Sequence, residues 1–262
     1  MDKGIIGAVP TQAGSRWVKL ARASLVLLLC ILFALTHFFQ STPRHVRVPA
    51  RLRDVEIADH CAHLSPIGAD EFLARRDALA QTLRDLNASM YVAEPGASSL
   101  FYGNISKSNW GLSERPLLLL VTPEEVDGRV RGKLSVLTPA FEAPRAKMLP
   151  LPSSDVTFVS WAEEANPYLH ALAVLSDTPG SIYVDASIRT FIVDGLRAAH
   201  PDSDVHSAPY EIRRLRERKS DAELELMKCA NEATVLAIRA VHKKLYFGIH
   251  ESTASSMLTE AL

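Results

Sequence analysis

The closing stretch of the chain, residues 211–262, limits the fold most strongly because it predicts helices that cannot form a core by themselves. Ser220–Glu223 reads Ser-Asp-Ala-Glu, the spacing of a capping box, in which the serine and the glutamate each satisfy a backbone N–H at the start of a helix. Apolar residues then recur every three or four positions over Leu226–Val241. This period predicts a long amphipathic helix.

A second amphipathic helix is predicted from Glu251 to Leu262, after Gly248, which suits the end of the first helix. Two helices of this size cannot bury a core alone. They must therefore pack on the preceding domain or on a missing continuation of the chain. The basic run Arg213–Lys219 before them is interrupted by acidic residues and contains no aromatic residue. We interpret it as an exposed interdomain linker and expect no nucleic-acid binding.

An uncharged apolar run, Ala23–Phe39, bears on where the chain resides. As a helix it spans about 25 Å, slightly less than a bilayer core of ~30 Å, and its flanking residues can lengthen it. We expect a single transmembrane signal-anchor helix after a short cytoplasmic tail, residues 1–22; a cleaved signal peptide or a buried helix are the alternatives. Because most of the chain follows the run, we expect the folded domain to be lumenal or extracellular, beyond a stem at residues 40–64.

The three cysteines form no disulfide framework. Cys30 lies in the apolar run, which leaves either one pair, Cys61 with Cys229, or two unpaired thiols, and the second is the simpler interpretation. His60 and His63 flank Cys61, but no second ligand pair follows at the spacing of a zinc site. We therefore interpret this segment as a surface linker.

Two sequons, at Asn87 and Asn104, are candidate glycosylation sites and agree with a lumenal or extracellular domain. At 262 residues the chain has room for one full domain with additions. Its net charge of −1 argues against a general role in binding nucleic acid or acidic surfaces.

Residues 65–208 alternate between apolar strands and amphipathic helices, which predicts an α/β domain with a mixed sheet flanked by helices. The run Leu117–Val121 is apolar throughout, so we expect a strand buried on both faces. The other expected strands are Met90–Ala93, Ser99–Tyr102, Leu134–Thr138, Val156–Val159, Ile182–Val184 and Val205–His206. The expected helices are Ala69–Asn87, Phe141–Met148, Glu163–Leu175 and Ser187–Ala199.

The segment Ile212–Thr234, IRRLRERKSDAELELMKCANEAT, resembles the entry into the catalytic domain of the creatinase/aminopeptidase P/prolidase family of metallopeptidases. Upstream, Phe101–Gly103, Trp110–Pro116 and Pro139–Ala146 resemble the amino-terminal domain of the same family. The resemblance covers roughly residues 65–262. It implies a creatinase-type amino-terminal domain at 65–208, followed at 209–262 by a linker and the first helices of an incomplete, truncated pita-bread catalytic domain.

The resemblance also implies a reaction, removal of the residue that precedes proline in a peptide. In the family, two divalent, manganese-like metals held by two Asp, one His and two Glu perform it, and these ligands lie downstream of the entry helix. None of those ligand motifs matches a position in this chain, so we assign no catalytic, cofactor-binding or metal residue. We expect the chain to hold no cofactor and to be inactive alone.

Trp110 and Arg115 are the candidates for a contact with a substrate groove or a partner subunit, because the family's amino-terminal domain packs on a catalytic domain. The alternative is loop anchoring, with Trp110 covering the edge of the core. For the whole chain the partners implied are a homo-oligomer or the missing catalytic domain, and a peptide only at full length. The alternative function is a non-catalytic, membrane-anchored module for oligomerisation or partner binding.

Overall fold

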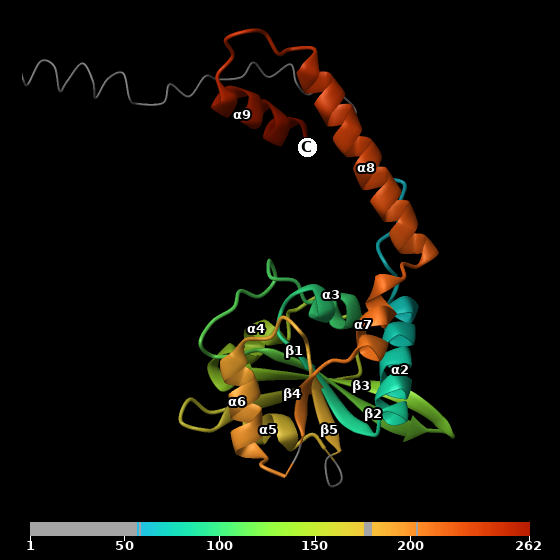
Figure 1. Cartoon of the computed structure of the whole chain (residues 1–262), viewed down its shortest axis with the longest axis vertical. Coiled ribbons are helices and arrows are strands. Elements are labelled where there is room, and N and C mark those ends of the chain that lie inside the picture. The colour runs from blue at the N-terminus through green and yellow to red at the C-terminus, as the bar shows by residue number, and fades with distance from the viewer. Residues whose placement is uncertain (1–56, 58, 176–179, 203) are drawn as a thin grey trace, which may run out of the picture. The chain divides into compact units, whose positions relative to one another are not determined.

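The structure, a computed structural model, describes residues 57, 59–175, 180–202 and 204–262 (Figure 1). The predicted transmembrane segment Ala23–Phe39, the tail before it and most of the predicted stem lie outside these residues. In the described part of the chain, no helix combines the length and the apolar character needed to cross a bilayer.

A six-stranded mixed sheet in the order β4-β3-β2-β1-β5-β6 forms the centre of the domain. Its strands are β1 (Ala88–Ala93), β2 (Leu118–Val126), β3 (Arg129–Pro139), β4 (Val156–Trp161), β5 (Ser181–Val184) and β6 (Val205–Ser207). β2 runs antiparallel to both β1 and β3, whereas the other neighbouring strands are parallel. The predicted α/β class and mixed sheet are confirmed.

Helices cover both faces of this sheet (Figure 1). Residues of α2 (Ala69–Asp85), α3 (Ala97–Gly103), α4 (Ala143–Ala146) and α7 (Tyr210–Glu217) share one apolar cluster with one face. Residues of α5 (Pro167–Leu172) and α6 (Thr190–Ala199) share a second cluster with the other face. A short 3-10 helix, η2 (Ala140–Glu142), precedes α4.

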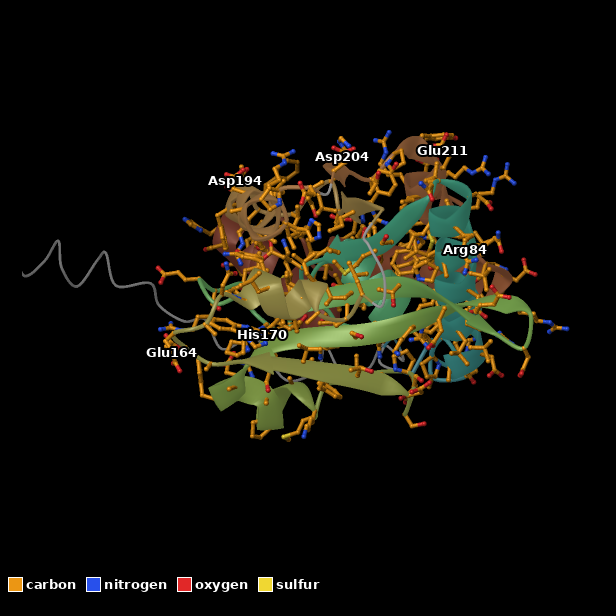
Figure 2. All side chains as sticks on the ribbon, turned by 90° about the horizontal axis from the view of Figure 1, so that it is seen from below. Arg84, Glu164, His170, Asp194, Asp204 and Glu211 are labelled. Atoms are coloured by element: carbon orange, nitrogen blue, oxygen red, sulfur yellow. A yellow bond between two sulfur atoms is a disulfide. The ribbon has the colours of Figure 1, made fainter. Side chains whose placement is uncertain are left out.

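The central strands β1 and β2 contribute side chains to both clusters, as the period of two along a strand requires. Tyr91, Leu119 and Val121 point to the α2 side, and Val92 and Leu120 point to the α5 side. The run Leu118–Val121 is fully buried, which confirms the predicted double-sided burial. Charged side chains such as Arg84, Glu164 and Asp194 instead point outward at the periphery (Figure 2).

The remaining helices are α8 (Asp221–His242) and α9 (Glu251–Ala261). The predicted capping box is present at the start of α8: the Glu223 N–H donates to Ser220 Oγ at 3.1 Å, and the Ser220 N–H donates to Glu223 Oε2 at 3.0 Å. α8 ends before Gly248, earlier than predicted. Residues 241–261, with α9, form a second compact unit, separate from the unit Val55–Ala240 that holds the sheet.

Two predicted elements are wrong. Ser99–Tyr102 was expected to be a strand but lies in α3, where the Gly96 N–H donates to Ser99 Oγ at 2.7 Å at the start of the helix and Phe101 and Tyr102 are buried. Arg213–Lys219 was expected to be an exposed linker but mostly belongs to α7. Ile212 of this helix is buried, and Leu215, three residues later, is half-buried against the sheet. These two side chains attach the helix to the core, although the other side chains of Arg213–Lys219 are charged.

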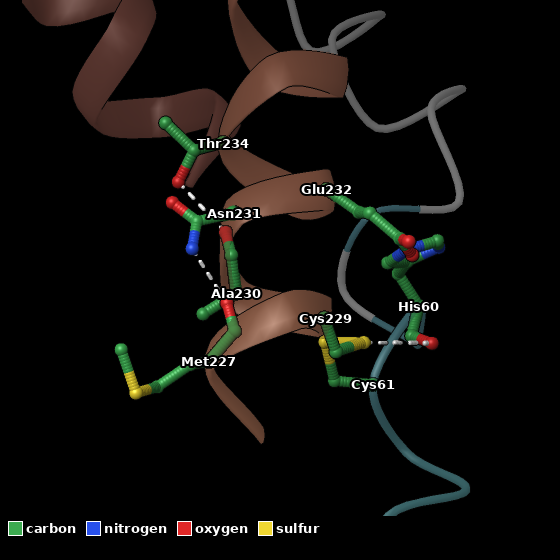
Figure 3. The surroundings of a disulfide bond; sticks show 8 residues. All are labelled: His60, Cys61, Met227, Cys229, Ala230, Asn231, Glu232 and Thr234. Carbon is green, nitrogen blue, oxygen red and sulfur yellow. Dashed lines mark hydrogen bonds and ion pairs between the residues drawn. A yellow bond between two sulfur atoms is a disulfide. The ribbon is translucent and has the colours of Figure 1, made fainter. Parts of the chain in front are cut away.

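A disulfide between Cys61 and Cys229 joins the segment before α2 to α8, with the two Cα atoms 5.9 Å apart (Figure 3). This corrects the expectation of two unpaired thiols. The cysteines are 168 residues apart in sequence, and no local pattern reveals such a pair. His60 Nε2 lies 3.3 Å from Glu232 Oε2 beside the disulfide, so part of the predicted stem is attached to α8.

From the disulfide we predict which of the three cysteines reacts with a thiol reagent. In the oxidised chain, denatured without reductant, an alkylating reagent should modify Cys30 but neither Cys61 nor Cys229. Replacing both Cys61 and Cys229 by serine should lower the free energy of unfolding by about 2–4 kcal/mol, because the cross-link restricts the unfolded chain. Mass spectrometry and urea unfolding measure the two effects, with Cys30→Ser as the matched control. Alkylation of all three cysteines before reduction would contradict the pairing.

Candidate functional site

A cavity of about 1040 Å³ opens among α2, α3, α7 and the first turns of α8. Asp185, which follows β5, and Ala208, which follows β6, line it, so it lies at the carboxyl ends of the parallel strands. This edge is where α/β sheets most often bind ligands. Its volume suits a small molecule or a short peptide.

Asp185 is the centre of a hydrogen-bond network at the sheet side of the cavity. Its Oδ2 accepts from the Tyr91 hydroxyl at 2.8 Å and from the Ser98 hydroxyl. Its Oδ1 accepts from the backbone N–H of Ser187 at 2.9 Å and from the Ser187 hydroxyl at 2.5 Å. Burial acts to raise the pKa of Asp185, but the hydrogen bonds from Ser187, Ser98 and Tyr91 outweigh it and hold this pKa below its ordinary value. The carboxylate is therefore ionised at neutral pH.

Two buried tyrosines stand beside this carboxylate. Burial, reinforced by the charge of Asp185, raises the pKa of Tyr91, and burial is also the main cause of the raised pKa of Tyr102. Both phenols therefore keep their protons at neutral pH. The rings of Tyr91 and Tyr102 pack edge to face at 5.7 Å between centroids, and Phe101 packs on Tyr102 in the same way at 5.0 Å.

Arg75 connects three helices at the cavity wall. It pairs with Glu71 within α2 and with Glu223 Oε1 of α8 at 3.2 Å. It also donates to the carbonyl oxygen of Phe101 in α3 at 3.2 Å. Its guanidinium lies 4.2 Å from the centroid of the Phe101 ring and 5.1 Å from that of Phe72. The side chain is only 9% exposed, so these contacts are shielded from water.

The two predicted contact residues do not line this cavity. Trp110 is 2% exposed, and the Arg145 guanidinium covers its ring at 4.0 Å, so the tryptophan anchors its loop in the core. Arg115 is exposed, donates from Nε to Glu163 Oε1 at 2.5 Å and lies 5.8 Å from the Phe141 ring. Only Arg115 is therefore accessible to a partner, and that contact stays a prediction.

A buried ion pair that sequence reasoning missed fixes the same loop. Glu94, whose side chain is 6% exposed, accepts from the Arg189 backbone N–H at 3.0 Å and from its guanidinium Nε at 2.9 Å. The guanidinium Nη2 of Arg189 also donates to the carbonyl oxygen of Ser113 at 2.7 Å. The pair thus joins the end of β1, the start of α6 and the loop that carries Arg115.

The two sequons occupy different environments. Asn87 is exposed just after α2, with a φ of 51°. Asn104 ends α3 with a φ of 57°, donates from Nδ2 to the carbonyl oxygen of Pro150 at 2.8 Å and lines the cavity. Asn87 is therefore the more accessible acceptor for a glycan.

No group of three or more His, Cys, Asp or Glu side chains is arranged to hold a metal ion in the part of the chain that the structure describes. The segment around Cys61 provides no such group, because Cys61 is in the disulfide and His60 faces Glu232. The described residues do not fit the two-metal centre that the family resemblance implies for a longer protein.

No family model matches the sequence. An uncharacterised peptidase of Schizosaccharomyces pombe is 32% identical over 222 residues, which cover 83% of this chain and 46% of the relative. Among solved structures, the dipeptidase PepE from Mycobacterium ulcerans superposes with a TM-score of 0.60 at 21% identity, over 75% of this chain and 50% of that one. A prolidase from Thermococcus sibiricus gives 0.59 at 16% identity with the same coverage. The chain spans about half the length of these relatives.

The two ion pairs of the loop predict contrasting effects of substitution. Arg189→Met leaves the buried Glu94 carboxylate without its guanidinium partner and should lower the free energy of unfolding by about 3 kcal/mol. Arg115→Ala breaks an exposed pair and should leave stability unchanged within error. Urea unfolding of both variants makes the comparison, and equal losses of stability would contradict the assigned burial.

Asp185 predicts a dependence of stability on pH. Its pKa is lower in the folded protein than in the unfolded chain, so its contribution is complete above the unfolded value of about 3.9 and is lost as pH falls through the lower folded value. Asp185→Asn should therefore reduce stability by about 1–3 kcal/mol at neutral pH and flatten the acid limb of the profile. Unfolding measured across this range tests it, with the exposed Asp194→Asn as control. An unchanged acid limb in Asp185→Asn would refute the assignment.

Proposed function

We propose that the chain belongs to the creatinase/aminopeptidase P/prolidase family and is the amino-terminal part of a peptidase that removes the residue preceding proline. The observation that carries this proposal is the junction after the sheet domain. There, α7 and the capped start of α8 continue directly from a complete six-stranded domain. The relatives that share this domain are about twice as long as the chain. The activity of such a longer protein is part of the proposal.

Helix α8 supports a junction with a further domain. Its residues Leu224, Val235 and Ile238 follow helical spacing and are 51%, 44% and 53% exposed. A stripe of this kind on a helix marks a surface for another protein part. We propose that the catalytic half of the longer protein, or a second subunit, covers it.

Catalysis in this proposal belongs to the part of the protein that the chain does not include. The metal centre of the family supplies an activated water and polarises the peptide carbonyl. The described residues do not fit such a centre, so we derive no chemical step from them. Their role is to fold, to fix α8 by the Cys61–Cys229 disulfide and by Arg75, and to present the outer side of α8 to the catalytic half.

The second candidate function is a non-catalytic, membrane-anchored module that binds a partner or forms a homo-oligomer. The observation that favours it is the completeness of the sheet domain, whose two apolar clusters are filled by its own helices. The sequence of the transcript beyond the codon for Leu262 separates the two candidates. Downstream codons for the Asp, Asp, His, Glu, Glu set support the peptidase, and an immediate stop supports the module.

We propose a location on the lumenal or extracellular side of a membrane, with Ala23–Phe39 as a single-pass anchor. The disulfide supports it, because such bonds persist mainly in oxidising compartments. The exposed sequon at Asn87 is compatible with the same location.

The proposal predicts that the chain alone is inactive. The purified 262-residue chain, incubated with manganese and a peptide whose second residue is proline, should release no free amino acid. A known proline-specific aminopeptidase in the same assay is the positive control. Metal-dependent release that a chelator abolishes would contradict the assignment of catalysis to another part of the protein.

A further inference from the structure

The hydroxyls on the sheet side of the cavity present hydrogen-bond acceptors. The hydroxyls of Tyr91, Ser98 and Ser187 line the cavity, and each donates its single proton to Asp185. A hydroxyl that has donated its proton has only oxygen lone pairs left for a ligand. Together with the ionised carboxylate, these oxygens favour a ligand group that is positively charged and rich in donors, such as an ammonium.

The α7 side of the cavity has the opposite character. Arg75 and Glu223 are paired with each other, so the other charged lining groups on this side are Arg213, Arg216 and Lys219 against Glu217. Within the described residues, no ion pair involves Arg213 or Arg216. Lys219 Nζ is directed to the carbonyl oxygens of Arg216 and Glu217, at 3.1 and 2.9 Å. This side therefore favours an anionic ligand group.

Much of the remaining wall of the cavity is apolar and aromatic. It is lined by Phe72, Leu100, Phe101, Tyr102, Leu226 and Met227. A di- or tripeptide spans roughly 7–10 Å when extended, which suits a cavity of about 1040 Å³. Aromatic faces also favour an ammonium group over a neutral one.

We propose that the cavity binds a short peptide with apolar side chains, free at both ends. Its ammonium group lies at Asp185 and the three hydroxyls, and its carboxylate lies at Arg213 and Arg216 of α7. The site consists of residues of this chain alone and contains no catalytic group. The inference does not depend on the proposed peptidase activity, because binding is measured without turnover.

Isothermal titration of the full chain in detergent micelles tests the proposal with three probes. Leucyl-phenylalanine carries both charges, its N-acetyl derivative lacks the ammonium, and its carboxamide lacks the carboxylate. Neither residue is proline, so the result is separate from the proposed reaction. Leucyl-phenylalanine should bind, and each derivative should bind about tenfold or more weakly, since each loses one charge-assisted contact.

Variants assign each end of the peptide to its side of the cavity. Arg216→Gln should weaken binding of leucyl-phenylalanine about tenfold but leave its carboxamide unaffected, because the lost contact is to the carboxylate. Arg214→Gln, an exposed residue on the same helix outside the lining, should leave both affinities unchanged. Asp185→Asn should abolish the preference for leucyl-phenylalanine over its N-acetyl derivative.

Two results overturn the proposal. One is the absence of a binding heat with leucyl-phenylalanine at millimolar concentration in the folded, oxidised chain. The other is equal affinity for leucyl-phenylalanine and either derivative, which would show that one of the two ends is not recognised. Arg216 is exposed on α7, so its variant reports on binding even if Asp185→Asn proves too unstable to study.

Discussion

The arrangement around the cavity depends on the shielded guanidinium of Arg75. From one position on α2 it holds the carbonyl oxygen of Phe101 in α3 and the carboxylate of Glu223 in α8, while it stacks on two phenylalanine rings. A lysine has one charged nitrogen and no planar surface, so it could not make this set of contacts. Glu223 is also the second half of the capping box, so the same residue starts α8 and attaches it to α2.

The Cys61–Cys229 disulfide attaches α8 to the sheet domain at a second point, further along the helix. Cys229 lies about two turns after the cap and is bonded to the segment before α2, so α8 is attached to the sheet domain at two successive points. With its inner side fixed in this way, the helix turns Leu224, Val235 and Ile238 outward, away from the cavity that Met227 lines. Both proposals use this arrangement: the outer stripe is the surface for a further domain, and the attached inner side closes the peptide cavity.

Much of the fold could be predicted from local patterns. The uniformly apolar Leu117–Val121 identified a central strand, and Ser220 with Glu223 identified the start of α8. Predictions failed where contacts that the local sequence does not reveal stabilise the structure. Ser99–Tyr102 has strand-like composition but is helical, with the Gly96 N–H bonded to Ser99 Oγ at its start and Phe101 and Tyr102 buried in the core. Arg213–Lys219 resembles a linker because only the neighbouring Ile212 and Leu215 reach the core.

The candidate site was beyond local patterns for a related reason. Its members come from α2, β1, α3, the end of β5, α7 and α8, and only the tertiary fold brings them together. Asp185 and Ser98 are separated by 87 residues in the sequence. The ion pair of Glu94 and Arg189, which lies outside the cavity, joins residues 95 positions apart. An acid after a strand was visible in the sequence, but its three hydroxyl donors were not.

Hydrogen–deuterium exchange of the full chain, followed before and after reduction, tests the attachment of α8 most directly. In the oxidised chain the amides of Glu223–Glu232 should exchange slowly, and reduction of Cys61–Cys229 should accelerate them while the amides of β1 and β2 keep their protection. Exchange in α8 that is as fast as in an unstructured peptide before reduction, or unchanged by it, would contradict the account.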